Sequence, residues 1–304
     1  MKQGFVTIAT GDAQYYRMAR TLLRSYRQNC PQPLPFAILC DRENEFTAEF
    51  DDVVILPDPK RSWMDKMALL THCPYDENLF LDADCTVYRD INHMMARFSG
   101  QSSDFSCFGL VLPMDSENGW FTRKAAELYP IRFITHLHGI SYFVRKSPVI
   151  DELRTLCDDI TVNYEKLRFS CFPTKLADEP IFALAMAVLD LKPIQAKPDD
   201  YCFVPSATSL RANYLKRKTV YRTPWDGKVR GGCILHWSNA ETIKGTYRLE
   251  AEKIDHLHSK KSGFRAFLHE CIRFHSHIPA FFYFLQDARR ALLARIRNKR
   301  QGLI

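Results

Sequence analysis

A short apolar run that ends in two acids constrains the fold of this chain more than any other segment. Residues 78–88 read NLFLDADCTVY, so Asp82 and Asp84 follow directly after the apolar residues. In an extended segment, residues two apart point to the same side, so both carboxylates can face one point while Ala83 points away. A strand with this ending is typical of an open α/β sheet, where ligands bind beyond the strand ends. Two hard oxygen ligands on one side suit Mg²⁺ or Mn²⁺.

The alternative for this motif is a solvated loop with two surface acids, which an isolated Asp-x-Asp often is. The apolar approach to the two acids argues against a loop. No lysine or arginine lies between Glu77 and Arg89, so the surrounding sequence offers no side chain that would neutralise the pair. The ligand-binding interpretation therefore needs support from other segments.

The composition is that of an ordinary globular protein. The 304 residues are 46% hydrophobic and 25% charged, which allows one large domain or two of average size. The first residues lead into a strand-like run that is too short and too polar for a signal peptide, so we expect a cytoplasmic protein. The ten cysteines form no Cys-x-x-Cys motif and several lie in apolar runs, which indicates buried free thiols in a reducing compartment.

Strand-like and helix-like stretches alternate over most of the chain, which predicts a mostly parallel sheet with covering helices. The expected strands are residues 5–10, 35–40, 53–56, 78–81, 105–112, 140–144 and 232–237. The expected helices are residues 13–27, 63–72, 91–98 and 179–190. Asp178 is placed to cap the last of these helices, and Pro180 fits its first turn. Every apolar stretch is far shorter than the roughly 20 residues of a membrane-spanning helix.

Lys66 occupies an unusual position in its predicted helix. Ser62 and Asp65 form a capping-box pattern, so the helix is expected to begin there. Lys66 then lies in the first turn, where a cation is unfavourable for the helix dipole. Its position suggests a contact with an anion, such as a diphosphate at the helix start. The alternative is a surface lysine whose charged end reaches solvent.

His236 ends a second apolar run and could reach the same edge of the sheet as Asp82 and Asp84. A neutral imidazole beside two carboxylates is a reasonable set of ligands for Mn²⁺. A structural histidine is the alternative. Among the other histidines, His138 is of interest because it directly precedes Gly139.

Asp178 and Glu179 begin a predicted helix and allow two interpretations. Acids at this place stabilise the start of a helix. A carboxylate at a helix start that faces a sheet crevice can also hold a sugar hydroxyl or stabilise developing positive charge. The two roles are compatible.

The order of these segments resembles the GT-A-type glycosyltransferases, particularly the glycogenin-like retaining family, family 8. The resemblance covers about residues 5–250 and rests on residues 6–15, 66–70, 79–84, 138–143, 177–180 and 234–237. It implies a Rossmann-like, mostly parallel sheet of GT-A type with covering helices. The chain departs from the family at Glu179, where Gln is usual, and around Leu137 and His138, where the family has Asn.

The resemblance implies a binding site for a UDP-sugar donor. The residues implied to bind it are Ala9, Thr10, Tyr15, Lys66, Asp82, Ala83 and Asp84. The first three would contact uridine, with the tyrosine able to stack on the base, and the lysine would lie near the donor phosphates.

The resemblance also implies a metal ion and catalytic acids. Asp82, Asp84 and His236 would bind Mn²⁺ or Mg²⁺, which would neutralise the departing diphosphate. Bond cleavage would pass through an oxocarbenium-like state. Asp178 or Glu179 would be the catalytic group that stabilises it.

The function that follows is a hexosyltransferase that moves a hexose from a UDP-sugar to a glycan or lipid-linked acceptor, with retention. One alternative is a haloacid dehalogenase-like phosphohydrolase, with Asp82 as nucleophile and Asp84 as general acid. That motif normally opens its domain, whereas roughly 80 residues of α/β pattern precede it here. The other alternative is a non-catalytic nucleotide-sugar binder, against which the intact Asp82, Asp84 and His236 argue.

The basic charge of the chain belongs to its C-terminal segment. Residues 260–304 hold ten Lys or Arg and two Asp or Glu, a net charge of +8, while the whole chain carries +7, which leaves −1 for residues 1–259. We therefore predict a glycosyltransferase domain over residues 1–259 and a basic helical tail over residues 260–304. Nucleic acid is not an expected partner, because the body is not basic.

The tail has an amphipathic pattern. Aromatic, aliphatic and basic residues recur at largely helical spacing over residues 278–304. Such a helix can lie on an anionic membrane surface, which would make the chain peripheral at the inner face of the membrane. A helix that packs on the body with a basic outer face is the alternative.

Overall fold

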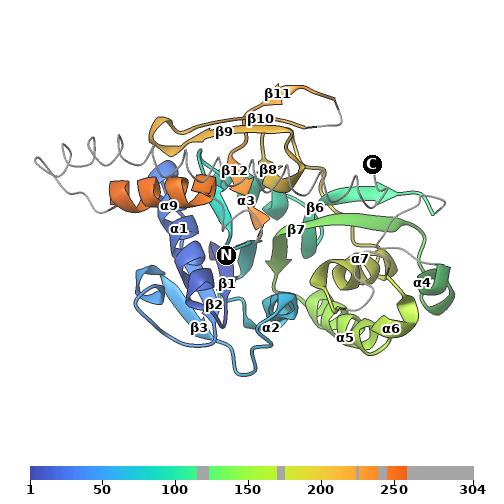
Figure 1. Cartoon of the computed structure of the whole chain (residues 1–304). Helices are drawn as coiled ribbons and strands as arrows, with labels where there is room; N and C mark the ends of the chain where they lie inside the picture. Colours follow the sequence, from blue (N-terminus) through green and yellow to red (C-terminus); the bar gives the residue numbers. More distant parts are fainter. Residues whose placement is uncertain (115–122, 170–174, 224–225, 239–244, 259–304) are drawn as a thin grey trace, which may run out of the picture. The chain divides into compact units, whose positions relative to one another are not determined.

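The computed structural model describes residues 1–114, 123–169, 175–223, 226–238 and 245–258 (Figure 1). The chain divides into two compact units. The first comprises Met1–Tyr201 and Gly232–His236, and the second comprises Cys202–Gly231 and the residues from Trp237 onward.

The first unit is built on one six-stranded sheet. Its order is β3 (Asp52–Ile55), β2 (Phe36–Cys40), β1 (Gln3–Ala9), β4 (Glu77–Leu81), β7 (Ile134–Arg145) and β6 (Phe105–Leu112). The first four strands pair in parallel, whereas β7 is antiparallel to both β4 and β6. The carboxyl ends of β1, β2 and β4 therefore lie at one edge of the sheet. This arrangement confirms the predicted mostly parallel sheet.

The two faces of the sheet are covered by different helices. Phe5 of β1 packs against Tyr26 of α1 (Ala13–Asn29), with ring centroids 4.7 Å apart. On β7, Tyr142 packs against Phe182 of α7 (Asp178–Val188) at 4.8 Å. Val6, the neighbour of Phe5, belongs to the same core cluster as Phe182, as the alternation of side chains along a strand requires.

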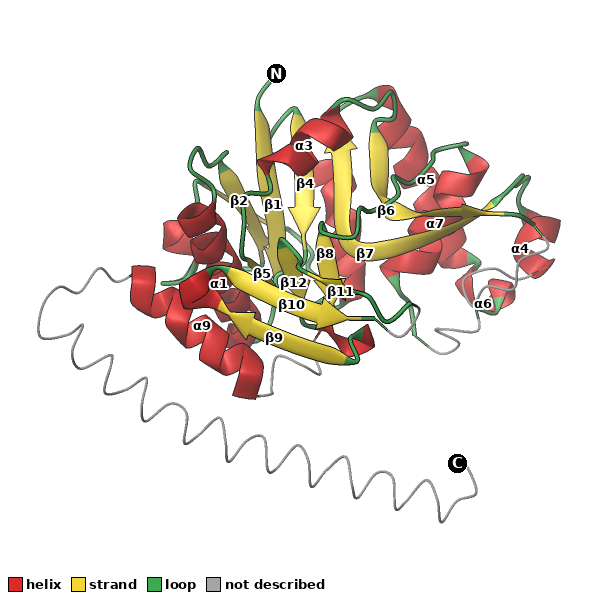
Figure 2. Ribbon diagram, turned by 90° about the horizontal axis from the view of Figure 1, so that it is seen from above, coloured by secondary structure: helices red, strands yellow, loops and turns green. Residues whose placement is uncertain are grey.

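The first unit has further elements beside this sheet and the helices α1 and α7. They are η1 (Thr47–Glu49), η2 (Trp63–Ala68), α2 (Leu69–His72), β5 (Cys85–Val87), α3 (Asn92–Ser99), α4 (Arg123–Leu128), α5 (Pro148–Val162), α6 (Tyr164–Leu167) and β12 (Ile234–His236). The helices α5 and α7 lie side by side, and α7 packs on β7 (Figure 2). The short strands β5 and β12 pair in antiparallel orientation, with His236 opposite Cys85.

Two predicted helix starts differ in outcome. Ser62 and Asp65 form the predicted capping box, although residues 63–68 continue as a 3₁₀ helix before α2 begins. Asp178 does not cap α7. The cap position is Ala177, and Asp178 is the first helical residue, because its carboxylate is buried and accepts a hydrogen bond from the Tyr142 hydroxyl at 2.7 Å.

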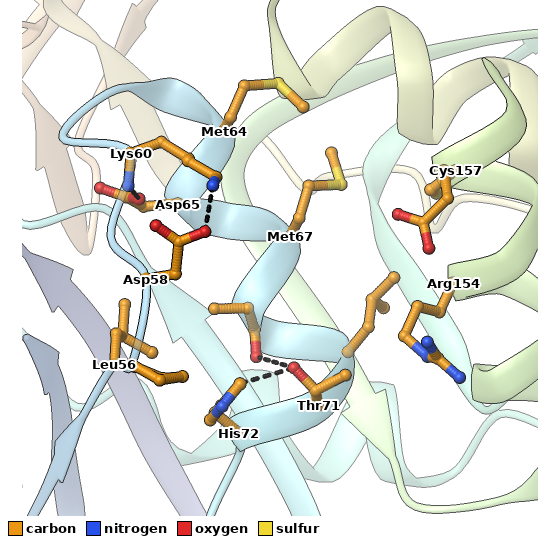
Figure 3. Close-up of a pocket in the computed structure, with 14 residues that line it drawn as sticks. Leu56, Asp58, Lys60, Met64, Asp65, Met67, Thr71, His72, Arg154 and Cys157 are labelled. Carbon is orange, nitrogen blue, oxygen red and sulfur yellow. Dashed lines mark hydrogen bonds and ion pairs between the residues drawn. The ribbon is translucent and has the colours of Figure 1, made fainter. Parts of the chain in front are cut away.

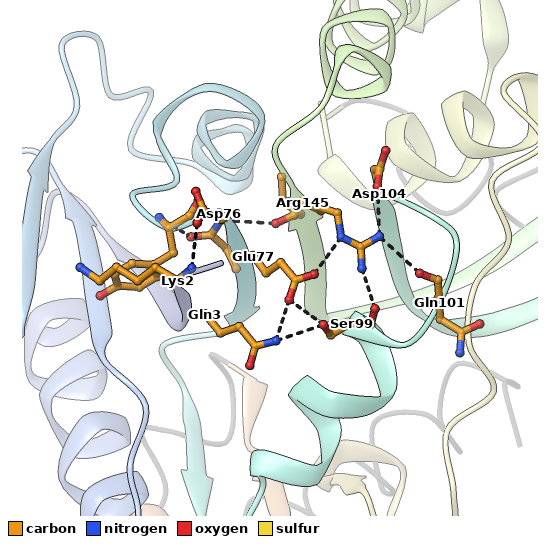
Figure 4. A network of polar contacts seen from close by, with 11 residues as sticks. Lys2, Gln3, Asp76, Glu77, Ser99, Gln101, Asp104 and Arg145 are labelled. Atoms are coloured by element: carbon orange, nitrogen blue, oxygen red, sulfur yellow. Dashed lines mark hydrogen bonds and ion pairs between the residues drawn. The ribbon is translucent and has the colours of Figure 1, made fainter.

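A polar network surrounds the amino end of β4 (Figure 4). Glu77 is 1% exposed, and its Oε1 accepts a hydrogen bond from Arg145 Nε at 2.8 Å. Its Oε2 accepts hydrogen bonds from Gln3 Nε2 at 2.7 Å and Ser99 Oγ at 2.6 Å. Arg145 also donates to Asp104 at 3.1 Å. Burial alone would raise the pKa of Glu77, but these hydrogen bonds hold that pKa below its usual value.

The second unit contains elements that the sequence analysis does not anticipate. The strand β8 (Tyr201–Phe203) spans the boundary of the units, followed by η3 (Val204–Ser206), β9 (Ser209–Asn213), η4 (Tyr214–Lys216), β10 (Lys218–Arg222), β11 (Val229–Arg230) and α9 (Gly245–His258). The strands β9, β10 and β11 form an antiparallel sheet. Glu250 of α9 is buried and accepts a hydrogen bond from the Tyr214 amide at 2.7 Å.

The predictions about cysteines, membrane spans and the tail have different outcomes. All eight cysteines of the described ranges are buried and free, as predicted for them. No helix among the described residues is long and apolar enough to cross a membrane. The predicted tail helix over residues 278–304 lies outside the described residues, so the boundary at residue 259 stays a prediction.

Candidate functional site

Asp82 and Asp84 lie in a tight turn between β4 and β5. The Asp82 amide donates a hydrogen bond to the carbonyl of Ile140 on β7 at 3.1 Å, which continues the pairing of β4 by one residue. The Asp82 carbonyl accepts a hydrogen bond from the Cys85 amide at 3.0 Å. Both carboxylates therefore stand at the carboxyl end of β4, where the sequence pattern places them.

His236 reaches these acids through the pairing of β12 with β5. Its Nε2 lies 3.2 Å from Asp84 Oδ1 and 3.5 Å from Asp82 Oδ2. Burial would lower the pKa of His236, but the charges of the two carboxylates raise it above its usual value. The structure thus brings together the three residues predicted to bind a metal ion, although 152 positions separate Asp84 from His236.

The three side chains fit a divalent cation. Asp84 Oδ1 is buried and accepts no hydrogen bond of good geometry within the described part of the chain, even though His236 Nε2 is close. The potential ligand atoms that lie within 4.8 Å of one another belong to Asp84, Cys85 and His236, a set that does not include Asp82. However, burial raises the pKa of the Cys85 thiol well above its usual value, so the neutral thiol is a poor ligand. The carboxylate of Asp82 suits Mn²⁺ or Mg²⁺ better.

Lys66 is the cation that compensates these acids. Its Nζ lies 3.0 Å from Asp82 Oδ1 and 3.5 Å from Asp178 Oδ2, and it donates a hydrogen bond to the Gly139 carbonyl at 3.1 Å. Burial would lower the pKa of Lys66, but the charges of Asp178 and Asp82 raise it. These contacts explain a lysine early in its helix. The acid pair thus has a neutralising partner, which comes from outside residues 77–89.

Gly139 connects Lys66 to Glu179. The Gly139 amide donates a hydrogen bond to Glu179 Oε1 at 2.8 Å, while its carbonyl accepts the bond from Lys66. A Cβ atom on residue 139 would lie 2.5 Å from Glu179 Oε1 and 2.9 Å from its Cγ, which is too close for any side chain. Glycine is therefore required at this position for Glu179 to approach the strand.

The acids of the site titrate differently. Burial raises the pKa of Asp82 to about 6, with attraction to Lys66 opposing the rise and repulsion from Asp84 adding to it. Burial would also raise the pKa of Asp84, but the charge of His236 holds it below its usual value. Burial raises the pKa of Glu179 to about 7, and the neighbouring Asp178 adds to this rise. At neutral pH, Glu179 is therefore poised between its two charge states.

The residues predicted to contact uridine lie near the ends of β1 and α1. Ala9 is the last residue of β1, and Thr10 follows it with a hydrogen bond from its Oγ1 to Asp65 Oδ2 at 2.6 Å. Tyr15 is half-buried in the first turn of α1. Because β1 and β4 are parallel neighbours, Ala9 and Thr10 reach the same edge of the sheet as Asp82. Their role in nucleotide binding stays a prediction.

Asp41 is a buried acid near these residues in the chain that the sequence patterns do not single out. This acid directly follows β2, and its side chain is 3% exposed. It accepts hydrogen bonds from the Tyr16 hydroxyl and from the Gly11 amide, the latter at 3.2 Å. Arg61 Nε lies 3.3 Å from it. An acid directly after a predicted strand was the available signal, since the same signal singles out Asp82.

A separate pocket of about 260 Å³ lies between the η2–α2 segment and α5 (Figure 3). Met64 and Met67 contribute to its wall from η2, and Cys157 and Arg154 contribute from α5. None of the predicted site residues lines this pocket. The candidate site is therefore the acid cluster at the edge of the sheet and not this cavity.

No family model and no curated protein sequence matches the chain. Solved structures match its fold. The galactosyltransferase LgtC, in complex with donor and acceptor sugar analogs, is 12% identical, with 86% of this chain and 96% of that chain covered and a TM-score of 0.50. The chain spans 46% of the glycosyltransferase GlyE of Streptococcus pneumoniae, with 64% of this chain covered, 14% identity and a TM-score of 0.40.

Mouse xyloside xylosyltransferase 1 is 11% identical, with 80% of this chain and 100% of that chain covered and a TM-score of 0.48. At such identities a likeness concerns the fold alone. The match to the galactosyltransferase confirms the predicted fold, a mixed α/β structure of GT-A type. Membership of family 8 stays a prediction.

Proposed function

We propose that the chain is a glycosyltransferase that moves a hexose from a UDP-sugar to a glycan or lipid-linked acceptor. The observation that carries the proposal is that His236 Nε2 lies 3.5 Å from Asp82 and 3.2 Å from Asp84, with Lys66 beside Asp82. This cluster stands at the carboxyl edge of the sheet, where ligands bind in open α/β folds. The fold is that of a galactosyltransferase whose solved structure holds sugar analogs.

The cluster has the chemistry that a nucleotide diphosphate requires. A bound Mn²⁺ or Mg²⁺ held by Asp82, Asp84 and His236 would supply Lewis-acid stabilisation of the leaving diphosphate. Lys66 adds a positive charge fixed by Asp82 and the Gly139 carbonyl, and we assign it to the orientation of the donor phosphates. In the same proposal, Ala83 contacts the donor between the two metal ligands.

Asp178 and Glu179 have distinct roles in this proposal. Asp178 is buried, accepts the hydrogen bond from Tyr142 and lies 3.5 Å from Lys66, so it positions the lysine. Glu179 is held by the Gly139 amide and is only half-buried, so it is the acid that can face the transferred sugar. Its ionised form would stabilise an oxocarbenium-like state. Retention of configuration is proposed from the family resemblance.

The nucleoside would lie beside the first strand. Ala9 and Thr10 stand at the end of β1, next to the strand that carries Asp82. The hydrogen bond from Thr10 to Asp65 fixes this turn against η2, the element that carries Lys66. We assign Tyr15 to stacking on the uracil ring, which a half-buried tyrosine at the start of α1 can do.

The fold does not favour the haloacid dehalogenase-like alternative. That mechanism needs Asp82 as a nucleophile directly after the first strand of its domain. Here β1, β2 and β3 precede β4 in the chain, and all four belong to one parallel arrangement. A non-catalytic nucleotide-sugar binder has the same fold and differs only in turnover.

Donor hydrolysis is the test that separates these functions. The protein would be incubated with a panel of UDP- and GDP-sugars, with Mn²⁺ or with a chelator, and release of free nucleotide diphosphate would be followed. A transferase slowly releases UDP from one donor when metal is present, since water replaces the missing acceptor. Binding without turnover would favour the silent binder. Turnover of phosphate esters with a phosphorylated Asp82 would establish the phosphohydrolase.

We also propose that residues 278–304 bring the enzyme to an anionic membrane surface. This segment lies outside the described residues, so the proposal rests on the net +8 of residues 260–304 and on the adjacent aromatic residues. A chain truncated at residue 277 should lose binding to anionic liposomes and keep donor hydrolysis. Binding of the full chain should weaken with salt, because charges are screened beyond about 10 Å at 0.1 M. Unfolding of the truncated chain would instead place the segment in the core.

A further inference from the structure

Three ring side chains beside the candidate site have no part in the proposed chemistry. His136 and His138 stand two residues apart on β7, with ring centroids 5.6 Å apart and an interplanar angle of 80°. The Tyr201 hydroxyl is hydrogen-bonded to His138 Nδ1, and its ring stacks on Phe108 at 5.6 Å. We call His136, His138 and Tyr201 the ring cluster.

The ring cluster is adjacent to the point where Lys66 and Glu179 meet. His138 directly precedes Gly139, whose carbonyl and amide bind those two side chains. Leu137 points into the core cluster, so alternation along β7 turns His138 to the opposite face. His138 also lies close enough to His236 for the charge of that imidazole to contribute to its own titration.

The ring of His138 is prepared to bind a neutral hydroxyl. Burial lowers the pKa of His138 to about 4, with the charges of His136 and His236 adding to the effect, so the ring is neutral at pH 7. The Tyr201 hydroxyl is hydrogen-bonded to Nδ1 of His138. Nε2 of His138 has no hydrogen-bond partner among the described residues. A neutral imidazole nitrogen accepts or donates one hydrogen bond according to its tautomer. Small-molecule sites are lined by aromatic side chains with a few placed polar groups, and the ring cluster offers both.

We propose that His138, positioned by Tyr201, hydrogen-bonds a hydroxyl of the sugar at the transfer point and thereby selects that sugar. The inference rests on the proposed function and extends it to specificity. The hydroxyl belongs either to the transferred hexose or to the acceptor sugar. The chemistry is the same for both sources, and the experiment separates them.

The first arm measures the donor. Affinities for UDP, UDP-glucose and UDP-galactose would be determined by calorimetry with Mn²⁺, for the wild type and His138→Ala. If the hydroxyl is on the donor, the variant loses about tenfold in affinity for the preferred UDP-hexose, the effect of one lost hydrogen bond, while its affinity for UDP stays within about twofold. The control His72→Ala removes a half-buried histidine of α2, which lies outside the candidate site, and should change neither affinity.

The second arm measures the acceptor. If the hydroxyl is on the acceptor, His138→Ala leaves the donor affinities unchanged and raises the acceptor KM about tenfold, with donor hydrolysis unaffected. His138→Gln carries an amide near the place of Nε2 and should restore part of the loss in either arm. Tyr201→Phe keeps the phenyl ring and should cost about threefold, with a shift of the His138 ring ¹⁵N resonances that reports the altered tautomer.

The melting temperature of each variant shows whether it folds. If His138→Ala has a lowered melting temperature, His138→Gln and Tyr201→Phe still test the inference. The inference is overturned if the wild type turns over a UDP-sugar while the His138 variants match it in donor affinity, acceptor KM and hexose preference. In that case the proposed function stands. A wild type that neither binds nor cleaves any nucleotide sugar overturns the proposed function and this inference together.

Discussion

The two ends of β4 carry buried acids that differ in how fully hydrogen bonds and opposite charges compensate them. At the amino end, both oxygens of Glu77 accept hydrogen bonds, and Arg145 supplies the opposite charge. At the carboxyl end, four acids surround one lysine and one histidine, and Asp84 Oδ1 accepts no hydrogen bond of good geometry from the described residues. The pKa of Glu77 is lowered, whereas the pKa of Asp82 rises to about 6 and that of Glu179 to about 7.

The difference separates a structural network from a functional one. A buried carboxylate with all its partners in place contributes to stability and leaves little for a ligand to satisfy. A cluster with excess negative charge and an unsatisfied oxygen is costly for the fold. Such a cluster is expected where a cation or substrate completes it. Variants in the network at the amino end of β4 can therefore serve as controls for variants at its carboxyl end.

The largest effect is expected from Arg145→Leu. The substitution leaves Glu77 buried without its opposite charge, which should lower the free energy of unfolding by about 4 kcal/mol. Mn²⁺-dependent UDP binding by the folded fraction should stay unchanged, because the site lies at the other end of β4. Urea unfolding measures the cost, and Arg154→Leu, which removes an exposed arginine, should cost less than about 0.5 kcal/mol. A loss below about 1 kcal/mol for Arg145→Leu would contradict the structural role of this network.

Asp84→Asn is expected to change the free energy of unfolding less than Arg145→Leu does. Its effect on UDP binding is expected to be larger. Loss of one anionic ligand should weaken Mn²⁺-dependent UDP binding about 100-fold, equivalent to about 2.7 kcal/mol. Stability should fall slightly, since the attraction to His236 that holds the pKa of Asp84 below its usual value is lost. Calorimetry with and without Mn²⁺ measures the binding. Asp104→Asn, from the network around Glu77, is the matched control and should bind UDP normally. Equal UDP affinity with and without Mn²⁺ in both variants and the wild type would remove the metal from the proposal.

The smallest effect is expected in the pH dependence of Glu179→Gln. Because the folded pKa of about 7 exceeds the usual value of 4.5, the native state binds more protons than the unfolded state between these values. Wild-type stability should therefore fall as pH rises from 5 to 8, by about 2 kcal/mol more than that of the variant. Glu77 contributes with the opposite sign and at lower pH: its lowered pKa stabilises the fold above 4.5, so wild-type stability should fall relative to Glu77→Gln as the pH drops below that value. Parallel pH profiles of wild type and Glu179→Gln would contradict the raised pKa.

Much of the first unit could be predicted because its signals are local. The run before Asp82 forms β4, and the Ser62 capping box forms as written. The buried stripe of α1 follows the helical period, with Asp12 capping its start. Each of these features depends on residues within a few positions of one another, so a short window of sequence contains the physical cause.

The errors concern contacts between distant segments. Lys66 meets Asp82 across 16 positions, and the sequence around the acids gives no sign of it. Aspartate is a preferred helix-capping residue, but the carboxylate of Asp178 accepts a hydrogen bond from the Tyr142 hydroxyl. A tertiary contact therefore overrides the local preference. The elements of the second unit are mostly short strands and single turns. Their patterns are too brief to separate from loops.

Gly139 has a consequence for how the sequence can evolve. A side chain at this position would overlap the carboxylate of Glu179, whereas a shorter residue at position 179 would remove the overlap. A larger residue at position 139 therefore requires that the side chain of residue 179 move away or become shorter. We expect the two positions to covary among homologues, with a residue shorter than glutamate at position 179 where position 139 is not glycine.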